Sequence, residues 1–116
     1  MGRCFFGFAF ADSMFAEAED CEISRRVLSI EEATTLIAEG VEPCLNPSHK
    51  ATIDAMRLRF GIDVNIPDAP VRVSLAKGDS LIVMGVRGLP RLTDRHEYSD
   101  EEIAQASFSF SLYTVA

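Results

Sequence analysis

The stretch that most restricts the fold is an apolar run near the start of the chain, residues 3–10, with the sequence RCFFGFAF. Apolar side chains follow one another here almost without alternation, which is typical of a strand buried on both faces. Such a strand lies inside a sheet that other elements must cover. The run therefore predicts an α/β architecture around a central strand.

Further strand patterns follow this run. Residues 21–28 mix polar and apolar side chains and predict a less buried strand. Residues 71–86 predict a β-hairpin that turns at Gly78. At the end of the chain, residues 107–115 alternate Phe and Leu with Ser and Tyr, as expected for a half-buried strand.

Two helices are predicted from capping boxes, in which a serine and a glutamate three residues later satisfy each other's backbone N–H groups. Ser29 and Glu32 begin one helix, which Gly40 ends. Ser99 and Glu102 begin a second, short helix over residues 99–106.

A third helix is predicted over residues 46–61, with Asn46 as N-cap, Pro47 at the first position and Gly61 as stop. This assignment places His49 on the first turn, near unpaired N–H groups and the positive end of the helix dipole. A positive environment lowers the pKa of an imidazole, so we expect His49 to favour its neutral form.

The order of these elements is strand, strand, helix, helix, hairpin, short helix, strand. No repeat, low-complexity tract or linker interrupts them, so residues 1–116 are interpreted as one domain. We expect a mixed sheet of about five strands flanked by helices.

The composition narrows the function classes. The formal net charge is −7, so non-specific binding to long nucleic acid is not expected, because the phosphate backbone would repel the protein. No apolar run approaches the roughly 20 residues of a membrane helix, and no secretory signal pattern is recognised at the N-terminus. A cytoplasmic protein with no membrane contact is expected.

Disulfide, metal and cofactor chemistry is not expected from the residue pattern. Cys4, Cys21 and Cys44 are odd in number and form no Cys-x-x-Cys pair, so buried free thiols are expected. The two histidines are far apart in the sequence and have no carboxylates at the spacing of a metal-binding motif, so they give little indication of a metal site. Cys44 with His49 could form a nucleophilic pair, although a cysteine just outside a helix more often serves packing.

The remaining chemistry lies in His49 and an arginine-rich loop. Arg91 can hold a phosphate through two parallel hydrogen bonds, and Asp94 could orient Arg91 or the substrate. Cleavage of RNA by its own 2′-hydroxyl needs only alignment, charge stabilisation and a proton for the leaving oxygen. From the residues alone, a structural or solvated His49 and a solvated arginine loop are the commoner interpretation.

Several motifs nevertheless resemble one family from end to end. They are FAFADSMF at residues 8–15, His49 followed by Thr52, KGDSLIVM at 77–84, and RLTDRHEYSDEEI at 91–103. In order and spacing these resemble the small viral anti-CRISPR ring nucleases that defeat type III CRISPR immunity. That family was first described as a domain of unknown function in archaeal viruses.

The resemblance implies a mixed sheet flanked by helices, a homodimer, and cyclic tetra-adenylate bound across the two-fold interface. A two-fold dimer presents one patch twice to a ring of near-equivalent nucleotides. It also implies metal-independent cleavage of this cyclic oligoadenylate, a ring-nuclease activity that yields a 2′,3′-cyclic phosphate. A viral or prophage origin follows from the same resemblance.

The resemblance also assigns roles to residues. His49 takes the place of the general acid, Arg91 that of the phosphate-binding arginine, and Asp94 stands where the family has Glu. Phe8 and Ala11 replace polar residues of the family's first motif, Ser48 replaces Gly before the histidine, and two residues are inserted before Arg91. The substrate-binding residues implied in this way are Ala11, Asp12, Ser13, Ser48, Lys50 and Arg87.

Two other functions stay open at this point. The chain could bind a cyclic nucleotide without cutting it, acting as a sponge, as the changed residues at 11 and 94 suggest. It could also be a protein-interaction protein that retains only the fold, with the acidic stretch at 17–22 meeting a partner, because a fold does not fix a function.

Overall fold

The computed structural model describes residues 2–10, 12–15, 20–45, 49–68, 73–89 and 98–116. Within these ranges the chain forms strands, helices and one 3-10 turn. In chain order they are β1 (Cys4–Gly7), the turn η1 (Asp12–Phe15), β2 (Ile23–Leu28), α1 (Ile30–Ala38), β3 (Glu42–Pro43), α2 (Lys50–Phe60), β4 (Ser80–Arg87), α3 (Asp100–Gln105) and β5 (Ser107–Val115).

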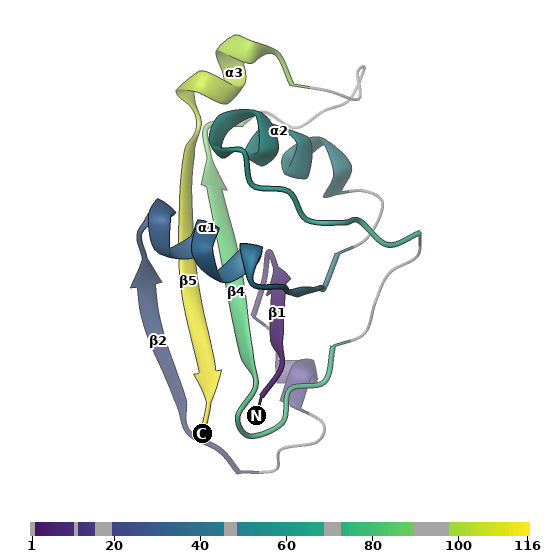
Figure 1. The fold of residues 1–116 in the computed structure, drawn as a ribbon, viewed down its shortest axis with the longest axis vertical. Coiled ribbons are helices and arrows are strands. Elements are labelled where there is room, and N and C mark those ends of the chain that lie inside the picture. Colours follow the sequence, from purple (N-terminus) through teal and green to yellow (C-terminus); the bar gives the residue numbers. More distant parts are fainter. Residues whose placement is uncertain (1, 11, 16–19, 46–48, 69–72, 90–97) are drawn as a thin grey trace.

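The strands form one mixed sheet in the order β2-β5-β4-β1-β3 (Figure 1). β5 runs antiparallel to both β2 and β4, whereas β1 runs parallel to both β4 and β3. The predicted α/β class, with a mixed five-stranded sheet and helices packed on it, is confirmed. The predicted interior strand is also confirmed, because β1 has a neighbour on each edge.

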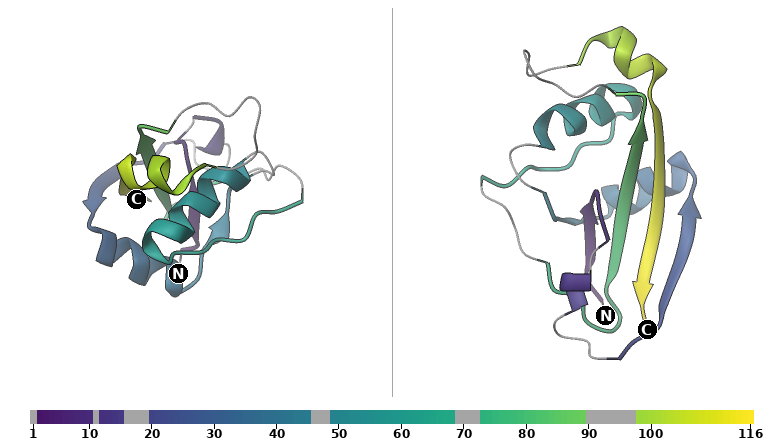
Figure 2. Two further views of the ribbon diagram at one scale, coloured as in Figure 1. Left: turned by 90° about the horizontal axis from the view of Figure 1, so that it is seen from above. Right: turned by 180° about the vertical axis from the view of Figure 1, so that it is seen from behind.

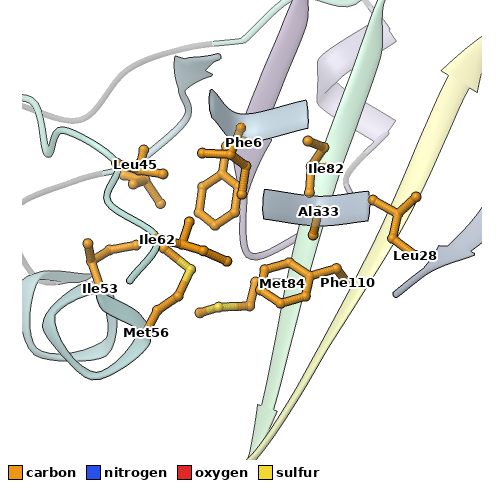
Figure 3. Close-up of a cluster of buried hydrophobic side chains, with 12 residues drawn as sticks. Phe6, Leu28, Ala33, Leu45, Ile53, Met56, Ile62, Ile82, Met84 and Phe110 are labelled. Carbon is orange, nitrogen blue, oxygen red and sulfur yellow. The ribbon is translucent and has the colours of Figure 1, made fainter. Parts of the chain in front are cut away.

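Helices α1 and α2 cover one broad face of the sheet, which we call the helix face (Figure 1). Its core contains Phe6 from β1, Ile82 and Met84 from β4, and Phe110 from β5, all at most 2% exposed. Side chains from both helices and from the segment after α2 close over them (Figure 3). These covering residues are Ala33, Ile37, Ile53, Met56, Ile62 and Val64.

The opposite face has a smaller core and no helix of eight or more residues over it in the described ranges; we call it the open face (Figure 2, right). Phe5, Leu81 and Val115 are buried there under η1 and residues 73–76. The two covering segments are joined by a hydrogen bond from the Leu75 N–H to the Met14 carbonyl, with an N···O distance of 2.6 Å.

Of the hairpin predicted over residues 71–86, the turn and the second strand are present, and the first strand is not found in its described residues. The turn is present, with Gly78 at φ 97°, and β4 follows it, but residues 73–75 form no strand. A strand has only two edges, and both edges of β4 are taken, by β1 and by β5. Residues 73–75 therefore pack onto the open face instead, where Leu75 is fully buried.

The central run and the edge of the sheet also differ from the prediction. β1 ends at Gly7 rather than at residue 10, and Phe8 and Phe10 continue outside the sheet. A β-carbon on Gly7 would lie 3.3 Å from the Cys44 carbonyl oxygen, because the chain after β3 passes close by. β3, only two residues long and containing a proline, carried no strand pattern and was not predicted.

Both capping boxes are confirmed: Ser29 with Glu32 and Ser99 with Glu102 exchange the expected side-chain and backbone hydrogen bonds. The third helix ends as predicted at Gly61, which is left-handed with φ 72°. Its start is later than predicted, because His49 is the N-cap and the helix begins at Lys50. Asn46 and Pro47 lie outside the described residues.

None of the helices in the described ranges is long and apolar enough to cross a membrane.

Candidate functional site

His49 lies where α2 begins, beside the end of β1. Its imidazole packs edge-on against the ring of Phe8, with ring centroids 4.6 Å apart and planes at 67°. Phe8 in turn contacts Phe6, a fully buried residue of the helix-face core, at 6.2 Å between centroids. The histidine thus contacts, through one aromatic ring, the buried core of the helix face, at the carboxyl end of the parallel pair β1 and β4.

The environment of His49 favours the neutral imidazole. The side chain is half-buried, and this burial lowers the pKa of His49 below its ordinary value, since desolvation penalises the charged form. The predicted direction of the pKa shift is confirmed, and its cause is burial. A neutral imidazole can accept a proton, or become protonated when a phosphate arrives beside it.

Lys50 lines a hollow of about 570 Å³ between α2 and the extended segment that follows it. Its Nζ lies 2.6 Å from Oδ2 of Asp54, and Nη2 of Arg57 lies 3.2 Å from Oδ1 of the same carboxylate. Ion pairs of this exposed kind are worth only a few tenths of a kcal/mol. Lys50, at the start of α2, and Arg57, in its last turn, therefore share one carboxylate but can turn toward an arriving anion at small cost.

Sequence reasoning missed this hollow and the contact between Phe8 and His49. A signal for the hollow was present, because Lys50, Asp54 and Arg57 share one side of a helix at spacings of four and three. The opposite wall, which includes Asp63, Asn65 and Asp68, could not be placed beside them from the sequence.

Arg87, a predicted substrate-binding residue, is the last residue of β4 and is exposed. Its register partner on β5 is Ser107, and alternation along β4 puts it on the open face, whereas His49 packs on the helix side. Within one chain, the structure therefore places Arg87 and His49 on different faces of the same end of the sheet.

Asp12 and Ser13, also predicted to bind substrate, belong to η1. η1 lies beside the start of β1, at the end of the molecule away from α2 (Figures 1 and 2). The structure thus does not bring these two residues to His49 within a single chain. The other predicted site residues, Ala11, Ser48, Arg91 and Asp94, lie outside the described residues.

The cysteines are free thiols, as expected, but each of Cys4, Cys21 and Cys44 is half-buried rather than fully buried. Burial raises the pKa of Cys4 and of Cys44, which disfavours the thiolate that nucleophilic catalysis requires. In the described part of the chain, no three His, Cys, Asp or Glu side chains are grouped so that they could hold a metal ion.

No protein-family model and no curated protein matches this chain. Among solved structures, the chain is similar to B116 of Sulfolobus turreted icosahedral virus, with a TM-score of 0.69 and 21% sequence identity. The match covers 97% of this chain and 99% of that chain. The chain therefore shares its complete fold, from first strand to last, with this archaeal virus protein.

Proposed function

We propose that this protein binds a cyclic oligoadenylate, most favourably cyclic tetra-adenylate, and opens the ring without a metal ion. The observation that carries the proposal is the position of His49: it stands at the start of α2, is half-buried on an aromatic support, and has a lowered pKa. Proton transfer at neutral pH needs an imidazole that is fixed in place and can exist in both protonation states.

The proposed reaction is an internal transesterification. The 2′-hydroxyl of one adenosine attacks the adjacent phosphorus, the bond from phosphorus to the 5′-oxygen breaks, and a 2′,3′-cyclic phosphate forms. His49, protonated when the anionic ligand arrives, gives its proton to the departing 5′-oxygen. The proton of the 2′-hydroxyl leaves to solvent, so the step is balanced and needs no other reactant.

Other residues would bind and position the phosphates. Arg91 is proposed to hold the scissile phosphate through a bidentate hydrogen-bond pair, with Asp94 orienting it. Lys50 supplies a cation at the same end of α2, and the unpaired N–H groups of the helix start add donors. Ala11, Asp12, Ser13, Ser48 and Arg87 complete the proposed contacts in a homodimer that holds the ring across its two-fold axis.

The biological setting proposed is that of a virus opposing type III CRISPR signalling in the cytoplasm of its host. Two findings support it: the motif order described above, and the shared fold with a protein of an archaeal virus. Removal of a cyclic messenger would silence the effectors that the messenger activates.

The test is incubation of the purified protein with cyclic tetra-adenylate in EDTA, followed by chromatography of the products. We expect linear products with a 2′,3′-cyclic phosphate end, and a loss of about 100-fold or more in rate for His49→Ala, the range of general acid–base catalysis. His96→Ala is the matched control, since His96 is the only other histidine of the chain. An uncut ring at high protein concentration would refute cleavage, and equal rates for the two variants would refute the role of His49.

Calorimetry with the same ligand separates cleavage from sequestration. Heat of binding with an uncut ring would identify a sponge, the second function consistent with these residues. No heat with any of a set of cyclic oligonucleotides would leave the fold serving a protein-interaction role.

A further inference from the structure

The helix that follows His49 is bonded at its other end to α3 through one side chain, Arg59. Arg59 lies in the last turn of α2, which ends at Phe60. Its Nη1 donates to the carbonyl oxygens of Ile103 and Ala106, at 2.7 and 2.8 Å, and both hydrogen bonds are partly buried. These bonds join two helices that are far apart in the sequence and that lie side by side in the fold (Figures 1 and 2).

The two carbonyl groups that accept these bonds belong to the end of α3. The last carbonyls of a helix have no partner within the helix, and a basic side chain in the last turn often bonds to them. α3 has six residues, none of them basic in its last turn, and Ala106 follows it as an extended C-cap. Arg59 therefore supplies from α2 the cation that the carboxyl end of α3 lacks.

Aromatic rings fix the guanidinium of Arg59 between the helix and the sheet. Its Cζ lies 5.5 Å from the ring centroid of Phe60 on α2 and 5.8 Å from that of Phe108 on β5. The two rings pack edge to face, with centroids 5.3 Å apart, and Phe60 also contacts the fully buried Phe110. A planar guanidinium can stack on such rings while it donates hydrogen bonds, which an ammonium group does less well.

The connection from β4 to α3, residues 88–99, begins against the same junction. Gly88 follows the last residue of β4 and has φ 90°. A β-carbon on Gly88 would lie 3.5 Å from Cα of Ala106 and 3.7 Å from the carbonyl oxygen of Gln105. The other end of the connection is Ser99, the N-cap of α3. Both ends of residues 88–99 therefore depend on where α3 is held.

We infer that Arg59 is a positioning residue, which sets the place of the connection 88–99 relative to His49 by bonding α2 to the end of α3. His49 and Arg59 stand at opposite ends of one helix, so a shift of α3 away from Arg59 is a shift away from His49 as well. The inference rests on the proposed function, because Arg91 and Asp94 lie within this connection in the sequence and are proposed to bind the scissile phosphate. A misplacement of about 1 Å can cost about 100-fold in rate.

Amide hydrogen exchange of the full chain, without ligand, tests the link itself. Arg59→Met keeps the length of the side chain but has no donor. We expect the amides of Ile103 and Ala106 to exchange about 10-fold faster or more, because the end of α3 loses two charge-assisted hydrogen bonds. Arg26→Met is the matched control, since Arg26 is also exposed but is paired with Glu32 on α1. Unchanged exchange in Arg59→Met would overturn the link.

Cleavage of cyclic tetra-adenylate tests the consequence for the reaction. We expect Arg59→Met to lower kcat by about 10-fold or more and to change KM by less than about threefold, because the contacts proposed at the start of α2 are untouched. Arg59→Lys keeps the charge and should recover part of the lost rate. In an Arg91→Ala background, Arg59→Met should have no further effect, because two residues that act through one contact are not additive.

The outcomes separate this inference from the proposed function. A wild type that cuts no ring refutes the function and any role of Arg59 in it, whereas exchange alone judges the link. A wild type that cuts the ring, with an Arg59→Met variant that cuts equally fast, overturns the positioning role. An equal loss of rate with and without Arg91 also overturns it, because a merely structural effect is the same in both backgrounds. Circular dichroism at the assay temperature checks folding, and Arg59→Lys carries the same comparisons if Arg59→Met does not fold.

Discussion

The two faces of the sheet differ in how the chain covers them. Among the described residues, α1, α2 and the segment after α2 enclose a core of twelve buried residues on the helix face. In the same part of the chain, four residues form the buried cluster of the open face, and a short turn and an irregular segment cover them. Two adjacent residues of β1 belong to different cores: Phe6 packs in the core of the helix face, and Phe5 packs in the core of the open face.

This difference shows that the candidate site lies on the better-enclosed side of the sheet. His49 is anchored, through Phe8, to the larger and better-enclosed core, which suits a group that must hold one orientation. Beyond the smaller core, residues 23–27 of β2 are exposed, as are Gly85 and Arg87 of β4 and Ser107 and Ser109 of β5.

The largest effect is expected from truncating the two phenylalanines of β1. Phe6→Ala should lower the free energy of unfolding by about 3–5 kcal/mol, because it opens a cavity among side chains fixed by two helices. Phe5→Ala should cost less, because the irregular cover of the open face can relax into the space. Urea denaturation of both variants measures the difference, and equal losses would show that the two cores are equally well packed.

A second prediction concerns Asp79, which ties the N-terminus to the cover of the open face. Its side chain is 6% exposed and accepts hydrogen bonds from the Arg3 N–H, the Arg3 guanidinium and the Ala76 N–H, all at 2.9 Å. Burial opposes ionisation, but these donors outweigh it and lower the pKa of Asp79 below its ordinary value. Asp79→Asn should cost about 1–3 kcal/mol at neutral pH, because buried donors lose acceptors.

The sign of the pH dependence follows from that lowered pKa. The carboxylate contributes its full stabilisation above the pKa of the unfolded chain, about 3.9, and loses it as the pH falls through and below that value. Melting temperatures measured from pH 7 downward should therefore fall less steeply for Asp79→Asn than for the wild type. Asp63→Asn, at an exposed position, is the matched control; parallel curves for Asp79→Asn and the wild type would contradict the assignment.

Sequence patterns predicted the elements well where local signals decide the structure. The two capping boxes, the left-handed Gly61 and the buried run at β1 all depend on residues close together in the chain. The failures concern pairing between distant segments. Residues 73–75 have a strand pattern, but both edges of β4 are taken by β1 and β5, and no local pattern records that competition.

The candidate site shows the same limit. The sequence placed His49 at a helix start and predicted the direction of its pKa shift, both from neighbouring residues. It did not predict that Phe8 would support the imidazole, because β1 and α2 meet only in the folded sheet. Nor did it predict that Arg87 would lie on the other face of the sheet from His49, or that Ser13 would lie at the other end of the molecule, because both placements depend on strand pairing between distant segments.

The smallest effect is expected from removing single helix caps. In Ser29→Ala the N–H of Glu32 loses the hydroxyl that accepts its hydrogen bond, at 3.1 Å, and α1 loses its N-cap. We expect a loss of about 1 kcal/mol in unfolding free energy, because α1 buries Ala33 and Ile37 on the helix face and must melt with the core.

Ser99→Ala removes the same cap from α3, which buries only Ile103 and can fray by itself. Its cost in global stability should be a few tenths of a kcal/mol, with faster amide exchange confined to α3. Equal global losses for the two variants would mean that α3 unfolds only with the sheet, and that the end of the molecule beyond β4 is as firmly held as the helix face.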